Sequence, residues 1–414
     1  MRILLTSDFF HPQIGGAERQ VQLLAAALAE RGHAVEVATV RQANLAVRDE
    51  VDGVPVHRLG AAASLFAGRA GNPDRFFLPP APDPRLVMGL RRVIRRQRSD
   101  LVHASGWIGY SSAAASLGLA PVILSARDYG YSCAVRSLLQ HETRVCSGPG
   151  LRKCLDCAGR HYGPAKGLIA VGGVFSGRPL LRRNVAGIHV VSRFVETIVR
   201  RDLLRADTWS PEVRRIPDIV PPANPEPLDT AGLELVDRLP SAPFILFVGA
   251  LQPHKGLPVL LRAYESLATK VPLVIIGTRW PNAPETVPGA TMLTDVPHAV
   301  VMAAWERSLF GVVPSLWPDP LPGVVREAMT RGRPVIGSAI GGNLDMIEDG
   351  RTGLLVPPGD VPALAAAMDR LLSDPDLCQR LGHEARRSTE PFTADAIATA
   401  FEDLYASALH GSRR

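Results

Sequence analysis

The sequence predicts an α/β protein of two doubly wound domains, each a parallel sheet covered by helices on both faces. Short apolar runs, typical of buried parallel strands, alternate with longer helical patterns along the whole chain. At 414 residues the chain is too long for one typical domain. A proline-rich stretch at 216–244 separates two halves that both show this alternation.

The predicted strands are brief and apolar. They are 2–6, 34–39, 101–103, 121–125 and 188–191 in the first half, and 244–248, 273–276, 309–313, 334–336 and 353–356 in the second. One helix between them is predicted by Val21, Leu24, Ala27 and Leu28, which share a face, and by Gly32 as its stop.

These elements predict an N-terminal domain at 1–220, a C-terminal domain at 221–395 and a final helix and tail at 396–414. Ligands of doubly wound sheets bind at the carboxyl ends of the strands. We therefore expect the two domains to face a central cleft that holds the ligand.

Composition favours a soluble cytoplasmic protein. The chain is 46% hydrophobic and 21% charged, begins without a signal-peptide layout and contains no apolar run of 18 residues. The net charge is +6, and the arginines are densest at 91–98. This stretch is either a solvated helix face or a surface for peripheral contact with the inner membrane face or an acidic acceptor. No aromatic residues interleave with the arginines, which argues against nucleic-acid binding.

Two glycines follow the first predicted strand. Gly15 and Gly16 lie just before a helix, where a residue without Cβ lets a ligand approach the backbone. Their N–H groups, with the positive helix end, could bind phosphate or sugar oxygens. The alternative is a plain tight turn.

A second group of polar residues gathers in the C-terminal half. Lys255 follows the strand at 244–248 and can neutralise a diphosphate. Asp319 lies in a later loop, and Glu327 follows eight positions on, where a carboxylate can accept bonds from sugar or ribose hydroxyls. The amides of Val324 and Val325, at the start of a helix, can hold phosphate.

These segments together resemble the retaining glycosyltransferases of family four, which have the GT-B fold of two Rossmann-like domains. The matching stretches are GGAER, VGALQPHKG, PSLWPDPLPGVVREAM, GRPVIGSAIGG and DGRTGLLVPPGD. The resemblance implies that Asp319 contacts the transferred sugar, Glu327 the ribose and Lys255 the diphosphate, with Gly16 close to it. The chain departs from the family at Ala250, where arginine is usual, and at Asp319, where glutamate is usual.

The resemblance implies transfer of a hexose-type sugar from a UDP- or GDP-type donor to a hydroxyl acceptor, in polysaccharide, glycolipid or secondary-metabolite synthesis. No Asp-x-Asp motif stands out, so no metal is expected at the donor site. A nucleotide-sugar epimerase and a zinc-stabilised, nucleotide-sugar-binding scaffold without turnover are the alternatives.

The acceptor side is expected after the strand at 121–125. Arg127 could stabilise leaving-group charge, and Asp128 could touch an acceptor hydroxyl; a structural ion pair is the alternative for both. His103 ends the strand before, and a core role is expected for it.

Four of the five cysteines cluster in an insertion near 130–160. Cys154 and Cys157 form a C-x-x-C pair, and Cys133 and Cys146 could complete a four-thiolate structural zinc site. An iron–sulfur cluster, free thiols and disulfides are the alternatives, although a reducing cytoplasm disfavours disulfides. Cys378 lies in a helical stretch and is expected to be packed.

Overall fold

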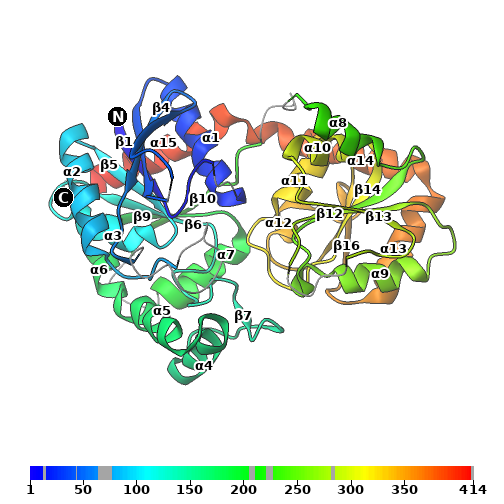
Figure 1. Ribbon diagram of the computed structural model, residues 1–414, viewed down its shortest axis with the longest axis horizontal. Coiled ribbons are helices and arrows are strands. Elements are labelled where there is room, and N and C mark those ends of the chain that lie inside the picture. Colours follow the sequence, from blue (N-terminus) through cyan, green and yellow to red (C-terminus); the bar gives the residue numbers. More distant parts are fainter. Residues whose placement is uncertain are drawn as a thin grey trace. The chain divides into compact units, whose positions relative to one another are not determined.

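The computed structural model describes residues 1–12, 15–42, 44–63, 77–204, 210–220, 227–280 and 285–411, and it separates into two compact units (Figure 1). The N-terminal unit comprises Met1–Ile219 and Ala394–Arg414, and the C-terminal unit comprises Val220–Thr393. The final helix therefore belongs to the N-terminal unit, whereas the sequence suggested a separate tail. Part of the proline-rich linker, 221–226, lies outside the described ranges.

The N-terminal unit contains an eight-stranded sheet of order β10-β9-β6-β5-β1-β2-β4-β3. Its strands are β1 (Arg2–Ser7), β2 (Ala34–Val40), β3 (Arg48–Val51), β4 (Val54–Leu59), β5 (Leu101–Ser105), β6 (Val122–Ala126), β9 (Val185–Val190) and β10 (Glu212–Arg215). Every pair is parallel except β3 with β4, which forms an antiparallel edge. A separate hairpin pairs β7 (Leu139–Gln140) with β8 (Arg144–Val145).

Helices cover both faces of this sheet. The helices of this unit are α1 (Gly16–Glu30), α2 (Pro84–Gln97), α3 (Ile108–Ser116), α4 (Leu151–Tyr162), α5 (Pro164–Ser176), α6 (Arg178–Asn184), α7 (Arg193–Ile198) with the π turn Val199–Leu204, and α15 (Ala394–Gly411). Of these, α4 packs against α5 rather than against the sheet. The predicted apolar face of α1 is buried, and Gly32 follows the helix with φ +84°.

Helix α15 is held to the N-terminal unit by polar contacts as well as apolar ones. Figure 1 shows α15 beside α1. Arg31 donates to Glu402 at 2.7 Å, and His33 shares a hydrogen bond of 2.7 Å with the same carboxylate. These bonds join the end of α1 to the last helix of the chain.

The C-terminal unit is a six-stranded parallel sheet of order β13-β12-β11-β14-β15-β16. Its strands are β11 (Phe244–Val248), β12 (Leu273–Gly277), β13 (Ala290–Thr294), β14 (Ser308–Val313), β15 (Val335–Ser338) and β16 (Gly353–Val356). Its helices are α8 (Thr230–Asp237), the 3-10 turn Pro253–Lys255, α9 (Leu257–Glu265), α10 (His298–Arg307), α11 (Gly323–Thr330), α12 (Asn343–Met346), α13 (Val361–Ser373), α14 (Pro375–Thr389) and the 3-10 turn Glu390–Phe392.

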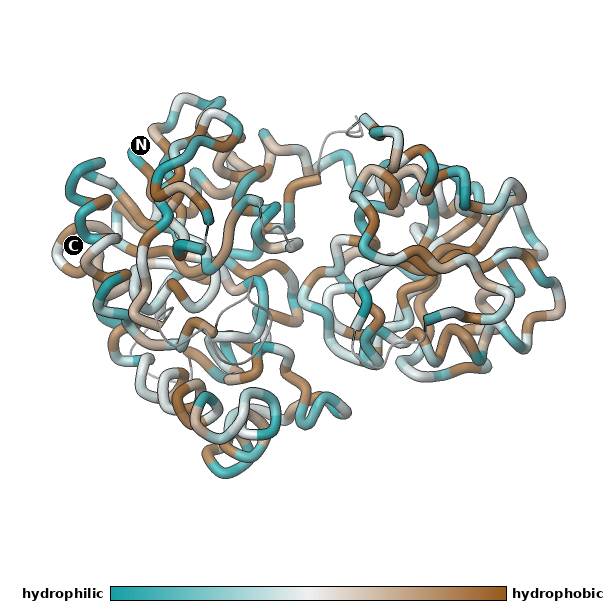
Figure 2. Tube along the Cα trace, in the orientation of Figure 1, coloured by the Kyte–Doolittle hydropathy of each residue, from teal (hydrophilic) through white to brown (hydrophobic). Residues whose placement is uncertain are grey.

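Two apolar cores lie on opposite faces of this sheet. One joins the strands to α9, α13 and α14, and the other joins them to α8, α10 and α11. The central strands are accordingly coloured as hydrophobic in Figure 2. The doubly wound prediction is confirmed for each unit. In the part of the chain that the structure describes, no helix is long and apolar enough to cross a membrane.

Candidate functional site

The donor-binding residues predicted in the C-terminal half lie in the loops and the helix that follow strands of the C-terminal sheet. The strands β11, β14 and β15 are parallel, so the loops that follow them share this edge. Gly256 sits in the first loop with φ +83°, and a Cβ added there would lie 1.8 Å from the Pro314 carbonyl oxygen. Only glycine fits this approach, which presses the β11 loop against the β14 loop.

Lys255 and Asp319 form the centre of this site. Lys255 Nζ donates to Asp319 Oδ2 at 2.6 Å and lies 5.1 Å from the centre of the Trp317 ring. The His254 ring packs edge-on against the same Trp317 ring, with 5.2 Å between the ring centres. The lysine side chain is 25% exposed and therefore within reach of a ligand, whereas the aspartate side chain is 11% exposed and nearly buried.

Glu327 points from α11 toward α10. Its Oε1 shares a hydrogen bond of 3.0 Å with His298 Nε2, at the first residue of α10. Sequence reasoning did not anticipate His298, because the two residues are brought together only by the packing of α10 against α11. The bond fixes one carboxylate oxygen of Glu327 and so orients the other.

The start of α11 provides the predicted amides. Pro322 precedes the helix, and no side chain caps it. The Val325 N–H donates to the Pro322 carbonyl at 3.1 Å, so this amide is already engaged, unlike the role predicted for it. The phosphate role of Val324 stays a prediction.

A second cation lies near this helix start. A Cβ added to Gly323 would be 3.5 Å from Nη2 of Arg326, whose residue is only 9% exposed. Because position 250 is alanine, the β11 loop lacks the arginine usual in the family. Arg326 places a positive charge at the same edge of the sheet.

Two buried polar atoms at this edge have no protein partner. Ser315 Oγ and Trp317 Nε1 are shielded from solvent and make no hydrogen bond within the described ranges. Buried polar groups are nearly always hydrogen-bonded, so these two atoms are available to bond a ligand or water at this edge. Both precede Asp319 in the same loop.

In the N-terminal unit, an ion-pair network spans the loops after β1, β5 and β6. Asp8 accepts the N–H groups of Trp107 and Ile108 at 3.1 and 2.7 Å and pairs with Arg136 at 2.9 Å. Arg136 also pairs with Asp128 at 2.6 Å. The structure thus places the predicted acceptor-side Asp128 in an ion pair, and it adds two partners that the sequence analysis missed.

Arg127 is turned into the protein. Its guanidinium pairs with Asp218, and the two side chains are 8% and 10% exposed. The alternative raised for Arg127, a structural ion pair, is therefore present, and its predicted catalytic role stays a prediction.

His103 has the expected core role. Its ring bonds the Tyr405 hydroxyl at 2.7 Å and Ser125 Oγ at 2.8 Å, and Ser125 Oγ bonds His189 at 2.6 Å. Burial, and then the Arg127 charge, lower the pKa of His189 to about 3. Both rings are neutral at pH 7 and tie α15 to the sheet.

The two N-terminal glycines differ from each other. The Gly15 N–H donates to Glu18 Oε2 at 3.0 Å, which caps α1. Gly16 is exposed, and a Cβ added there would meet nothing within 4 Å. Packing within the protein does not require glycine at position 16. The predicted close approach of a ligand to Gly16 therefore stays a prediction.

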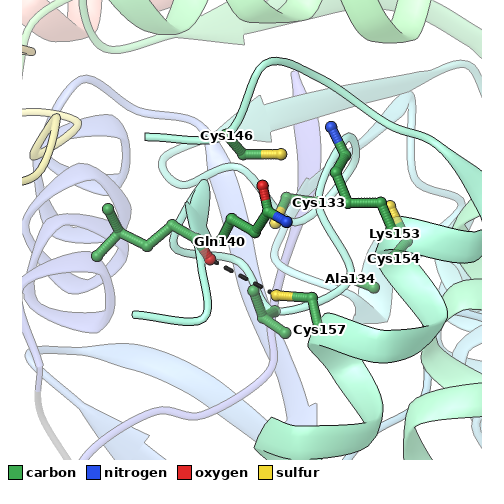
Figure 3. Close-up of a pocket in the computed structure, with 9 residues that line it drawn as sticks. Cys133, Ala134, Gln140, Cys146, Lys153, Cys154 and Cys157 are labelled. Atoms are coloured by element: carbon green, nitrogen blue, oxygen red, sulfur yellow. Dashed lines mark hydrogen bonds between the residues drawn. The ribbon is translucent and has the colours of Figure 1, made fainter. Parts of the chain in front are cut away.

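The four clustered cysteines line one small cavity of about 20 Å³ beside α4 (Figure 3). They are Cys133, Cys146, Cys154 and Cys157, and all are half-buried free thiols, as is Cys378. Burial raises the pKa of the Cys133 thiol to about 12. Over the described ranges, no group of three or more His, Cys, Asp or Glu residues is already placed to hold a metal ion.

Two family models match the chain. The model described as "Glycosyl transferase 4-like domain" matches residues 15–210, and "Glycosyl transferases group 1" matches residues 238–388. The two matches fall in the N-terminal and C-terminal units respectively, and the second contains every predicted donor residue except the two glycines.

Curated relatives match over part of the chain. A D-inositol 3-phosphate glycosyltransferase of Streptomyces bingchenggensis is 30% identical over 194 residues, which cover 42% of this chain and 43% of the relative. An alpha-D-kanosaminyltransferase of Streptomyces kanamyceticus is 32% identical over 166 residues, which cover 37% of this chain and 42% of the relative. The matches thus span less than half the length of these relatives.

Solved structures share the fold over nearly the whole chain. A sucrose-phosphate synthase from Thermosynechococcus elongatus superimposes with a TM-score of 0.71 at 22% identity, covering 99% of this chain and 100% of that one. The Anabaena protein HepE, solved in complex with UDP-glucose, gives a TM-score of 0.67 at 15% identity, covering 98% and 100%. At these identities the similarity shows the fold alone.

Proposed function

Because the chain belongs to the group 1 glycosyltransferases, we propose that it transfers a sugar from a nucleoside diphosphate to a hydroxyl acceptor with retention of configuration. The observation that carries the proposal is the pair of Lys255 and Asp319 at the carboxyl edge of the C-terminal sheet, followed directly by α11, the helix that carries Glu327. This edge is where doubly wound sheets bind nucleotides.

Lys255 is the residue proposed to hold the diphosphate. Without a ligand its ammonium group is paired with Asp319 at 2.6 Å. A diphosphate brought to the same place adds negative charge beside that carboxylate, and the lysine between them offsets the repulsion. Arg326 and the positive end of α11 add to this support.

The two carboxylates are proposed to divide the recognition of the donor. Asp319 lies in the loop before α11, close to the lysine and therefore to the sugar–phosphate bond. Glu327 lies within α11, where the ribose hydroxyls are expected. The His298 bond to Oε1 of Glu327 holds the carboxylate in place for this contact.

The proposed chemistry needs no protein nucleophile. The acceptor oxygen bonds to the anomeric carbon while the bond from that carbon to the diphosphate breaks, and the hydroxyl proton passes to the leaving diphosphate. The protein's contribution is to position both substrates and to stabilise the charge that develops on the leaving group. No donor-bound metal is proposed.

The donor is proposed to be of the UDP or GDP type. The structurally similar HepE was solved with UDP-glucose, which supports the UDP type, whereas a starch synthase from Arabidopsis thaliana was solved with ADP, so ADP is tested beside them. The acceptor, the cytoplasmic location and peripheral membrane contact stay predictions.

The arginine-rich stretch considered for membrane contact lies on α2. Two of its arginines have partners within the protein: Arg91 donates to the Ala115 carbonyl at 2.9 Å, and Arg96 pairs with Glu36 at 3.0 Å.

The test is nucleotide binding followed by turnover. UDP, GDP, ADP and TDP are titrated calorimetrically into the wild type, Glu327→Ala and Glu348→Ala. Glu348 is the matched control, since it precedes β16 at the amino edge of the same sheet and pairs with Arg351. Loss of hydrogen bonds to a charged group weakens binding about 10- to 100-fold.

We expect one nucleotide to bind the wild type and Glu348→Ala equally, and Glu327→Ala far more weakly. Equal affinity in all three would remove Glu327 from the site. Binding without transfer to any acceptor would favour the scaffold alternative. Conversion of the nucleotide sugar itself, with no acceptor present, would favour an epimerase.

A further inference from the structure

The cysteine cavity is built by three separate segments of the N-terminal unit. Cys133 follows β6, Cys146 follows β8, and Cys154 and Cys157 lie one turn apart on α4. Figure 3 shows their sulfur atoms around one space, with Lys153 beside them. One ligand bound by all four cysteines would cross-link the three segments.

The chain around the cavity has a costly conformation. Arg136, Leu138, His141 and Glu142 are not glycines, yet their φ angles are +65°, +56°, +52° and +61°. Left-handed residues of this kind persist only where the surroundings hold them. Apolar packing holds only one side of this segment: Val135, Leu138 and Leu139 are buried, whereas the β8 residues are exposed and Ala158 is the buried residue of α4.

One backbone amide is directed at a sulfur atom of the cluster. The Gly150 N–H donates to Cys154 Sγ at 3.4 Å. Amide donors of this kind stabilise thiolates and orient metal ligands.

A cation lies beside the cavity. Lys153 lines it and donates to Ser147 Oγ at 3.1 Å, whereas Arg201 is paired with Asp202 at 2.7 Å. Four thiolates around a divalent ion carry a net charge of about −2, which the lysine partly offsets.

We propose that Cys133, Cys146, Cys154 and Cys157 bind one structural zinc ion as a tetrahedral four-thiolate site. The cavity of about 20 Å³ has room for one ion among the four side chains. Binding draws the four side chains inward by rotation, since they line the cavity without yet being at ligand positions. This inference is independent of the proposed transferase activity.

The site has a consequence for the predicted acceptor side. The Arg136 N–H donates to the Cys133 carbonyl at 3.0 Å, and the Arg136 side chain holds Asp8 and Asp128. Zinc at Cys133 therefore fixes the loop that carries this ion-pair network.

The experiment measures metal in the purified full-length chain and in two serine variants. We expect about one zinc per chain in the wild type and in Cys378→Ser, the matched control for loss of a thiol. Cys154→Ser should lose most of the zinc. Equal zinc content in Cys154→Ser and Cys378→Ser would overturn the proposal.

A second measurement uses only the wild type and therefore does not depend on the folding of a variant. The chain is stripped of metal under reducing conditions and titrated with Co²⁺. Four thiolates give thiolate-to-cobalt charge-transfer absorption and tetrahedral ligand-field bands, which zinc then abolishes. Absence of this spectrum, or purification of the chain with iron and sulfide or with disulfides, would overturn the proposal.

Discussion

Replacing Gly256 by alanine tests how the loop that carries Lys255 is built. The residue has φ +83°, and its added Cβ would lie 1.8 Å from the Pro314 carbonyl oxygen. The alanine therefore has two costs, a left-handed backbone and an overlap with a backbone atom that no side-chain rotation can relieve.

Gly350 separates these two costs. Its φ is +73°, and a Cβ added there meets nothing within 4 Å. The left-handed conformation costs alanine about 1–2 kcal/mol at either site. Relief of the overlap at Gly256 requires the two loops to part, and overpacking of this kind costs about 1–3 kcal/mol more. We expect losses of about 1–2 kcal/mol for Gly350→Ala and about 2–5 kcal/mol for Gly256→Ala.

The assay is urea unfolding of both variants, followed by calorimetric titration with the nucleotide that binds the wild type. Because parting the loops moves Lys255 away from Asp319, Gly256→Ala should also bind the nucleotide more weakly, whereas Gly350→Ala should bind it normally. Equal destabilisation by the two substitutions would refute the close contact with Pro314. Unchanged nucleotide affinity in Gly256→Ala would refute the link between that contact and the site.

Four further predictions follow from the site and the core. Gly16→Ala meets open space, so stability in urea should hold or rise by about 0.4–1 kcal/mol while sugar transfer falls; unchanged transfer would contradict the ligand role. Lys255→Met should weaken binding of a nucleoside diphosphate about tenfold or more without affecting the nucleoside, and equal weakening of both would exclude a phosphate contact. Arg127→Met leaves the Asp218 carboxylate buried without its arginine and should cost about 3–5 kcal/mol in urea, so wild-type stability would refute the ion pair. The pKa of His189 is lowered from 6.5 to about 3, so between these pH values the unfolded chain binds a proton that the folded chain does not. The free energy of unfolding should therefore fall as pH falls from about 6.5 toward 3, by up to about 1.4 kcal/mol per pH unit for this group. His189→Gln should flatten that slope.

Continuous apolar runs made the central strands predictable. Each predicted strand overlaps an observed one, because a strand buried on both faces is apolar at every position. The strands that were missed lie at or near the sheet edges, as β3 does with the sequence RDEV and three exposed residues. An edge strand keeps one side in solvent, so its sequence resembles that of a loop.

The candidate site was only partly predictable. Lys255 and Asp319 were identified by their places in loops after strands, Glu327 by its spacing from Asp319, and their roles by the family resemblance; the structure joins the first two directly. Their partner His298 and the pair of Arg136 with Asp8 were missed. Nothing in the local sequence marks residues that approach one another only after the sheet has formed.

The sequence by itself determined the α/β architecture, the two-unit organisation and the chemical types at the donor edge. Hydrophobic periodicity and turn residues are local properties, and each strand or loop carries its own. The tertiary structure decided which charges face a ligand and which face the protein. Arg127 and Lys255 both follow parallel strands, yet Arg127 is buried against Asp218 while Lys255 stays at the rim beside Asp319. That difference depends on contacts between residues that are 91 and 64 positions apart in the sequence, and these contacts form only when the sheets are assembled.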